Sequence, residues 1–235
     1  MTLPKFQAIL FDLDDTLYPE REYVFSGFRA VATWVEARLG IPQAQGIEEL
    51  LGLYETGQRR QTFDVWLERH GKRQEVPVKR LVEVYRQHAP TIAPHPGAAE
   101  LLDSLRKTYR LGLVSDGYLA VQQRKLAALG LAHYFDTVVF SDEWGRAAWK
   151  PNRRPFEAAL ERLGGIPPTL VVYVADNPEK DFIGARQLGL KTIRVRYPYG
   201  VYCDITPESA AYQPDLDITT LEEVGQALPV LEERL

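Results

Sequence analysis

The chain has little of several residue types on which whole classes of protein depend. Cysteine occurs once, at Cys203, so the chain cannot form an intramolecular disulfide or a cysteine-based metal cluster. The four histidines show neither the HxH nor the HExxH spacing of common zinc sites. Positive charge is not in excess either, because the formal net charge is −4. This balance argues against a broad basic face that would bind nucleic acid.

Long apolar runs are missing as well. No apolar segment approaches the ~20 residues that a helix needs to span a bilayer. Pro4-Lys5 stands where the apolar region of a signal peptide would begin. We therefore expect a cytoplasmic protein without a membrane partner. What is present, 45% hydrophobic and 26% charged residues, is typical of a globular protein with ample material for a core.

The apolar pattern divides the chain into three parts. Residues 6–11 predict a short strand. From about Glu20 to about Ala89, apolar residues recur at helical spacing without a convincing strand. Helices and strands then alternate: the pattern predicts helices over 97–108, 118–130, 154–164 and 178–189, and strands over 110–115, 137–141, 169–175 and 191–196.

Strands that alternate with helices of this length indicate right-handed βαβ units and a parallel sheet. The expected fold class is therefore α/β, with a Rossmann-like parallel sheet as the core. The helical stretch after the first strand is expected to form a small second domain, a cap. We place the core at residues 1–18 plus 93–235 and the inserted cap at 19–92. Phe63 and Trp66 are expected to belong to the core of the cap.

Polar residues follow each of four predicted strands. Ligands of an open parallel sheet bind beyond the carboxyl ends of its strands, so these residues are candidates for a site. They are Asp12, Asp14, Asp15 and Thr16 after the first strand, Ser115, Asp116 and Gly117 after the second, Lys150 and Pro151 after the third, and Asp176 and Asp181 after the fourth.

Each of these residues also has an ordinary structural interpretation. Asp12 and Asp14 could form a solvated turn, and Ser115 could cap a helix. Asn177 followed by Pro178 is typical of a helix start, and we expect Asn177 to cap the helix over 178–189. The convergence of four segments on one sheet edge favours the functional interpretation.

The segments resemble the signatures of the haloacid dehalogenase superfamily of phosphotransferases and hydrolases. In order along the chain, the matching segments are DLDDT (Asp12 to Thr16), VSDG (Val114 to Gly117), KP (Lys150 and Pro151) and DNPEKD (Asp176 to Asp181). The helical insert is similar to the small α-helical cap of that family. Four ordered motifs are together far more specific than the first alone.

The chain departs from the family pattern in four places. Asp116 follows Ser115 where the family usually has asparagine, and Ala175 precedes Asp176 where glycine is usual. The loop GRAAWKP before Lys150 is about two residues longer than the pattern. Asp15 stands where many relatives have glycine, and we expect its side chain to face the hinge rather than a metal.

The closely spaced acids themselves call for a cation. Desolvation and mutual repulsion penalise such carboxylates, and a phosphate ester adds further negative charge. A hard divalent cation neutralises both the carboxylates and the phosphoryl oxygens. We therefore expect Mg²⁺ as cofactor, held by the side chains of Asp12 and Asp176 and by the backbone carbonyl of Asp14.

The resemblance implies a role for each remaining residue. Asp12 would attack phosphorus to form an aspartyl-phosphate, and Asp14 would serve as general acid and base. The phosphate-binding residues would be Ser115, Asp116 through its amide, Gly117 and Lys150, while Asp181 and Thr16 would lie behind them, Asp181 orienting Lys150 or a metal-bound water.

The expected function is Mg²⁺-dependent hydrolysis of a small phosphate monoester by a monomer or homodimer. The partner would be a small phosphorylated metabolite. A phosphomutase on the same core is an alternative, as is a phosphoacceptor or binding module without turnover. A haloacid dehalogenase needs neither the acid at Asp14 nor a metal, so Asp14 and Asp176 argue against it.

Three further features stay open at this point. His95 and Tyr18 lie at the two crossings between core and insert, where they could contact substrate or pack the hinge. The aromatic run from Arg196 to Asp204 could rim the site or form a dimer contact. Arg59 and Arg60 in the insert could bind an anion, although a solvated helix surface is the simpler interpretation.

Overall fold

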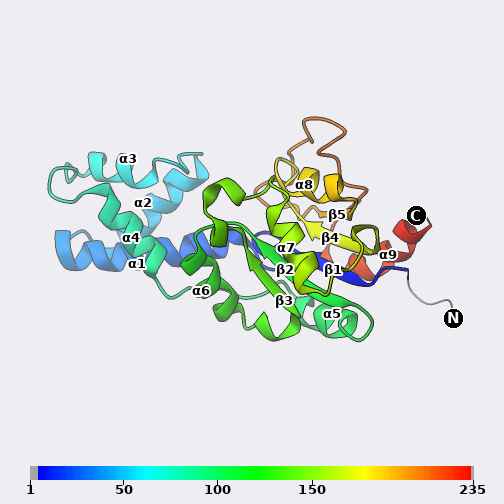
Figure 1. The fold of residues 1–235 in the computed structure, drawn as a ribbon. Coiled ribbons are helices and arrows are strands. Elements are labelled where there is room, and N and C mark those ends of the chain that lie inside the picture. The colour runs from blue at the N-terminus through cyan, green and yellow to red at the C-terminus, as the bar shows by residue number, and fades with distance from the viewer. Residues whose placement is uncertain (1–4, 234–235) are drawn as a thin grey trace. The chain divides into compact units, whose positions relative to one another are not determined.

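The computed structural model describes residues 5–233, which form two compact units (Figure 1). The first, here called the core unit, comprises the residues up to Glu20 and those from Ala93 onward. The second, here called the insert, is Arg21–Ile92. The insert is helical, and the core unit contains the sheet.

The described residues of the core unit contain one parallel sheet of six strands in the order β3-β2-β1-β4-β5-β6. Every pair of neighbouring strands is parallel. Their apolar sequences fit burial on both faces, which is the usual situation in a parallel sheet. The strands are β1 (Ala8–Phe11), β2 (Arg110–Ser115), β3 (Thr137–Phe140), β4 (Val171–Ala175), β5 (Lys191–Val195) and β6 (Leu216–Ile218).

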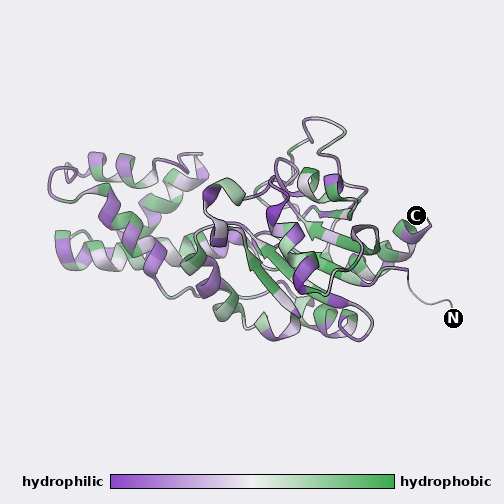
Figure 2. Ribbon diagram, in the orientation of Figure 1, coloured by the Kyte–Doolittle hydropathy of each residue, from purple (hydrophilic) through white to green (hydrophobic). Residues whose placement is uncertain are grey.

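Helices cover both faces of this sheet. The side chains of Leu10 and Tyr173 pack with Phe156 of α7 and Phe182 of α8 on one face. Right-handed crossovers place α5 and α6 on the other face, because their connections run in the opposite direction across the sheet. Figure 2 shows the hydrophobic strands between helices of mixed polarity. The helices are α5 (Ala98–Leu105), α6 (Leu119–Leu129), α7 (Arg154–Arg162), α8 (Asp181–Leu188) and α9 (Val224–Glu232).

The topology confirms the predicted α/β fold class. Strand order reverses at β1, because the chain moves from β1 to β2 and β3 and then crosses to β4. The carboxyl ends of β1 and β4 therefore flank the topological switch point, where open α/β sheets bind ligands. Asp12 and Asp176 directly follow these two strands.

The insert has its own apolar core. Phe28, Leu50, Phe63 and Trp66 are buried together, as the sequence predicts for Phe63 and Trp66. Close approach of α4 to α1 requires Gly27, since a β-carbon there would lie 2.4 Å from the ring of Tyr85. The helices are α1 (Glu20–Leu39), α2 (Gln43–Glu55), α3 (Thr62–Arg69) and α4 (Val78–Gln87).

Two parts of the fold differ from the sequence predictions. Neither β6 nor α9 is expected from the sequence pattern, and α8 begins at Asp181 rather than at Pro178. Asn177 does not cap a helix: its Oδ1 accepts a hydrogen bond from the amide of Glu179 at 2.9 Å, which closes a separate turn before α8.

The structure shows whether any described helix could span a membrane. Within residues 5–233, every helix is too short or too polar to cross a membrane.

Candidate active site

Lys150 lies at the centre of the candidate site. Its ammonium group is 2.6 Å from Oδ1 of Asp12 and 2.7 Å from Oδ1 of Asp181, and it donates to the hydroxyl of Tyr173 at 2.9 Å. The side chains of Lys150 and Asp181 are fully buried. The loop before Lys150 folds into two short 3₁₀ turns, Ser141–Trp144 and Arg146–Ala148, and so brings the lysine to the ends of β1 and β4.

Three carboxylates form a cluster here, and two of them contact Lys150. Oxygens of Asp12, Asp176 and Asp181 all lie within 4.8 Å of one another, and all three residues are buried. Burial raises the pKa of Asp12 to about 7, against the opposing charge of Lys150. Burial, together with the charges of Asp181 and Asp12, raises the pKa of Asp176 well above its usual range. Lys150 alone therefore does not compensate the cluster.

The donor set of this cluster fits a divalent cation. Both oxygens of Asp181 are already engaged, Oδ1 by Lys150 and Oδ2 by the amide of Asn177 at 3.0 Å. Asp12 and Asp176 remain as the carboxylates that would hold a cation. Hard oxygen ligands of this kind are those that Mg²⁺ prefers.

Asp14 is held by side chains of α6 and by Tyr18. Lys125 Nζ is 2.6 Å from its Oδ1, Gln122 Nε2 donates to its Oδ2 at 2.7 Å, and the Tyr18 hydroxyl also donates to Oδ1. Burial alone would raise the pKa of Asp14. The charge of Lys125 and these hydrogen bonds outweigh burial and lower that pKa. The structure therefore presents Asp14 as a carboxylate.

The carboxyl end of β2 contributes Ser115, and the segment after it contributes Gly117. Ser115 is buried and its Oγ accepts a hydrogen bond from Gln122 Nε2 at 2.7 Å. Gly117 has φ of 127°, a conformation that side-chain-bearing residues rarely adopt. A single amide of Gln122 thus links Ser115 to Asp14.

The carboxylate of Asp116 is fully engaged within the protein. Oδ1 accepts hydrogen bonds from the Ser141 hydroxyl and from the amide of Lys150 at 3.1 Å. Oδ2 lies 3.1 Å from the ammonium of Lys180. Burial would raise the pKa of Asp116, but Lys150 and Lys180 lower it. Only the backbone of Asp116 is left for a ligand.

Asp15 and Thr16 are not among the three carboxylates of the cluster. Asp15 has φ of 49°, which aspartate tolerates better than most residues and which explains why glycine also suits this position. Its carboxylate accepts from the amide of Glu20 at 2.7 Å and from that of Val201 at 2.8 Å. Thr16 is fully buried, and its hydroxyl has no hydrogen-bond partner among residues 5–233.

The aromatic run after β5 packs on the core unit. The ring of Tyr197 stacks on His95 with centroids 4.0 Å apart, and Tyr199 stacks on Tyr197 at 5.4 Å. Arg194 donates to the carbonyl of Asp176 at 3.2 Å and to that of Tyr202 at 2.7 Å. The run therefore braces both the start of α5 and the residue that would hold the cation.

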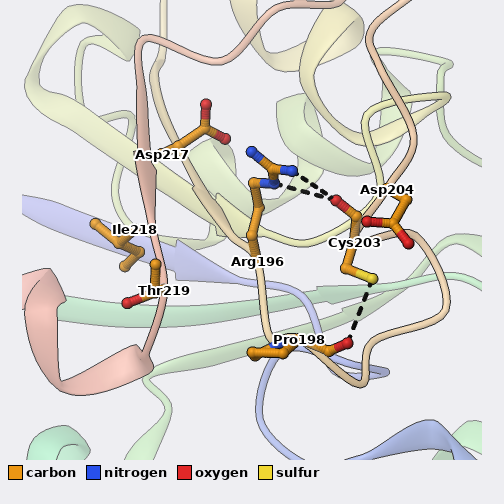
Figure 3. Close-up of a pocket in the computed structure, with 7 residues that line it drawn as sticks. All are labelled: Arg196, Pro198, Cys203, Asp204, Asp217, Ile218 and Thr219. Atoms are coloured by element: carbon orange, nitrogen blue, oxygen red, sulfur yellow. Dashed lines mark hydrogen bonds between the residues drawn. The ribbon is translucent and has the colours of Figure 1, made fainter.

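A separate pocket of about 360 Å³ lies beyond β5 and β6 (Figure 3). Arg196 in its wall donates twice to the carbonyl of Cys203, at 3.1 and 2.9 Å. Asp204 and Asp217 line the same pocket. With its one arginine engaged and two acids beside it, this pocket lacks the positive charge that a phosphate requires.

Sequence reasoning missed the residues that hold Asp14 and Asp116. Gln122 and Lys125 lie three residues apart on one face of α6, and both are buried. A buried lysine among the leucines of a helix needs a partner, and that is the signal in the sequence. Lys180 and Tyr173 give no comparable signal, because Lys180 stands among polar residues and a tyrosine in a strand is commonplace.

The chain is similar to known proteins in sequence. A model of the family described as haloacid dehalogenase-like hydrolase matches residues 9–195. Glyceraldehyde 3-phosphate phosphatase of Methanopyrus kandleri is 34% identical over 228 residues, which cover 93% of this chain and 95% of the relative. Pyrimidine 5'-nucleotidase YjjG of Escherichia coli is 33% identical over 170 residues, covering 71% of this chain and 69% of the relative.

Solved structures agree in fold. The HAD-hydrolase YfnB of Bacillus subtilis superposes with a TM-score of 0.68 at 21% identity, over 95% of this chain and 98% of the other.

Proposed function

The chain belongs to the haloacid dehalogenase-like hydrolase family, and on that premise we propose that it is a Mg²⁺-dependent phosphatase of small phosphate monoesters. The reaction would pass through an aspartyl-phosphate on Asp12. The observation that carries this proposal is the buried cluster of Asp12, Asp176 and Asp181 around Lys150. Burial of three neighbouring carboxylates is unfavourable even with Lys150 in contact and Lys180 nearby, and a further cation would offset this cost.

The nucleophile would be Asp12. Lys150 fixes one of its oxygens at 2.6 Å, which holds the carboxylate in one orientation. Attack on phosphorus forms the bond from Asp12 to the phosphoryl group and breaks the bond from phosphorus to the leaving oxygen. Mg²⁺, held by Asp12, Asp176 and the carbonyl of Asp14, would neutralise charge on the phosphoryl oxygens.

Asp14 would handle the proton in both steps. In the first step it gives a proton to the leaving oxygen, and in the second it removes one from the water that attacks phosphorus and releases Asp12. The contacts with Lys125, Gln122 and Tyr18 favour the ionised form, which the second step needs. The first step needs the protonated form of Asp14, which the negative charge of the bound phosphate ester would favour.

The phosphoryl oxygens would be bound by the segment after β2 and by Lys150. Ser115 contributes its hydroxyl, Gly117 its amide, and Lys150 its charge. Because Asp181 and Tyr173 orient the ammonium of Lys150, its position changes little as charge develops.

The substrate class follows from what the curated relatives share. The Methanopyrus kandleri relative is named for a triose phosphate and the Escherichia coli relative for a nucleotide. A phosphate ester is common to the two, whereas the rest of the substrate differs. We therefore propose a small phosphorylated metabolite and no finer substrate.

The proposal is tested by phosphate release from an aryl phosphate with Mg²⁺ or with EDTA. Wild type is compared with Asp12→Asn and with Asp103→Asn, a matched change at an exposed aspartate of α5. We expect turnover that requires Mg²⁺, is unchanged in Asp103→Asn and falls by about 10³-fold or more in Asp12→Asn. Equal activity in wild type and Asp12→Asn would refute the role of Asp12.

Two other results would point elsewhere. Transfer of the phosphoryl group to a sugar without phosphate release would indicate a phosphomutase. A stoichiometric burst without further turnover would indicate a phosphoacceptor module.

A further inference from the structure

Lys180 and Asp116 form an ion pair beside the expected phosphate-binding segment. The ammonium of Lys180 is 3.1 Å from Oδ2 of Asp116, which lies between Ser115 and Gly117. The Asp116 side chain is 4% exposed, whereas that of Lys180 is 33% exposed. One partner is thus fixed inside the protein, and the other reaches the surface of the site.

The two oxygens of Asp116 have different kinds of partner. Oδ1 accepts from two neutral donors, the Ser141 hydroxyl and the amide of Lys150. Among residues 5–233, the cation in contact with this carboxylate is Lys180, at Oδ2. An ammonium has three N–H donors, so the pair with Asp116 leaves donors available for a ligand.

The position of Lys180 in the chain brings it near the reacting groups. It directly precedes Asp181, whose Oδ1 contacts Lys150 at 2.7 Å. Its charge lowers the pKa of Asp12 and of Asp176, which places it within electrostatic range of both. Through its contact with Asp116, the ammonium of Lys180 lies beside the segment Ser115 to Gly117.

We propose that Lys180 is a second ammonium that binds the phosphoryl group of the substrate, with Asp116 as the positioning residue that holds it. This inference rests on the proposed phosphatase function. It explains why an acid occurs where the family usually has asparagine: the acid anchors a cation that the amide would not hold. The competing explanation is that Lys180 only neutralises Asp116.

A double variant separates these explanations. Asp116→Asn keeps the shape of the side chain, and Lys180→Met removes the charge at similar length, so Asp116→Asn/Lys180→Met contains no unpaired buried charge. Binding of inorganic phosphate in Mg²⁺ buffer is measured by calorimetry, together with the KM and kcat for an aryl phosphate. Lys107→Met is the control, because Lys107 pairs with Asp103 near the opposite ends of the strands.

We expect the double variant to bind phosphate about tenfold more weakly, with a similar rise in KM and a smaller change in kcat. Asp116→Asn alone is expected to weaken binding less, since Lys180 remains but loses its anchor. Lys107→Met should match wild type. The urea midpoint of the double variant should stay close to that of wild type, which excludes unfolding as the cause.

If the double variant has the same phosphate affinity and KM as wild type, the proposal is overturned. Lys180 would then be only a counter-ion of Asp116. If phosphate binding is too weak to measure in wild type, the KM of the ester decides in the same way. A wild type without turnover and without phosphate binding would instead refute the proposed phosphatase function itself.

Discussion

The core unit buries some of its charged residues, whereas an ion pair of the insert is exposed. In the core unit, Lys150 and Asp181 have fully buried side chains, and that of Asp12 is 6% exposed. In the insert, the ion pair of Arg73 with Asp64 has side chains 48% and 35% exposed. Exposed pairs of this kind contribute little to stability, whereas buried charges are costly to desolvate.

The difference teaches where to look for chemistry. Burial of several neighbouring carboxylates costs stability, so the cluster in the core unit is a candidate for function rather than a source of stability. The insert instead relies on apolar and aromatic packing around Trp66 and Phe28. Its cavity of about 260 Å³ is lined by aromatic rings together with Arg59 and Arg60, which are both exposed.

Replacement of the buried Lys150 in the core unit should have the largest effect on stability and turnover. Lys150→Met leaves Asp12 and Asp181 buried without their cation. Breaking a buried pair typically destabilises by about 3–5 kcal/mol, and loss of a preorganised charge lowers turnover by about 10²–10³-fold. Urea unfolding and aryl phosphate hydrolysis measure the two effects.

Added Mg²⁺ provides the control for Lys150→Met. If Asp12 and Asp176 hold a cation, Mg²⁺ should restore part of the lost stability of the variant but not its activity. Stability that is equal to that of wild type without Mg²⁺ would show that the cluster does not depend on Lys150.

Trp66→Ala tests the insert in the same way. Trp66 is fully buried, and its indole nitrogen donates to Glu49 at 2.8 Å. Truncation of a buried tryptophan costs about 3–5 kcal/mol, and we expect this loss in hydrogen exchange of α2 and α3. Trp66→Phe keeps a ring and should lose less. A large loss of protection in the strands of the core unit would contradict independent packing of the insert.

The sequence predicts the parts of the molecule that depend on local pattern. The strand predicted over 110–115 is β2 itself, because an apolar run between polar turns defines it. The strand β6 has only three residues and follows a long loop, so neither length nor alternation marks it. Asp12 and Asp176 could be placed together because parallel strands end at the same sheet edge.

Contacts between distant side chains could not be predicted in this way. Lys125 contacts Asp14, which is 111 residues away in the sequence, and the local sequence around either residue does not indicate its partner. Asp116 was expected to offer its amide to phosphate, but the destination of its carboxylate depends on Ser141 and Lys180. Such pairings are set by the tertiary fold rather than by pattern.

Lys125→Met tests whether a buried lysine of the core unit keeps Asp14 ionised. Loss of the ammonium leaves Asp14 buried without its main counter-charge, so the pKa of Asp14 should rise. Since Asp14 must be ionised to activate the water of the second step, the acidic limb of the kcat profile should move to higher pH, and kcat at neutral pH should fall by about tenfold. Lys125→Arg keeps the charge and should hold the limb near its wild-type position.

The Lys125 prediction has a clear contrary result. An acidic limb at the same pH in Lys125→Met and wild type would show that another group governs the pH dependence. The role of Lys125 as the partner that keeps Asp14 ionised would then be wrong.

His95→Phe tests a buried group of the core unit that is outside the carboxylate cluster. Burial lowers the pKa of His95 from 6.5 to about 4. The unfolded chain therefore binds a proton below pH 6.5 that the folded protein does not, and stability falls as the pH drops from 6.5 towards 4. The slope is at most about 1.4 kcal/mol per pH unit.

The variant should lack this part of the acid dependence. Phenylalanine keeps the stacking on Tyr197 but cannot bind a proton. The difference in unfolding free energy between wild type and His95→Phe should therefore be constant above pH 6.5 and change below it. Parallel curves across the whole range would show that His95 titrates normally in the folded protein.

Arg73→Ala should have the smallest effect. Its guanidinium is 2.9 Å from Asp64, but both side chains are partly exposed, so that solvent screens the attraction. We expect a loss of less than about 1 kcal/mol, and salt should reduce it further. Urea unfolding at low and high ionic strength measures both. A loss as large as that of Lys150→Met would contradict the comparison, because it would place an essential charge on the surface of the insert.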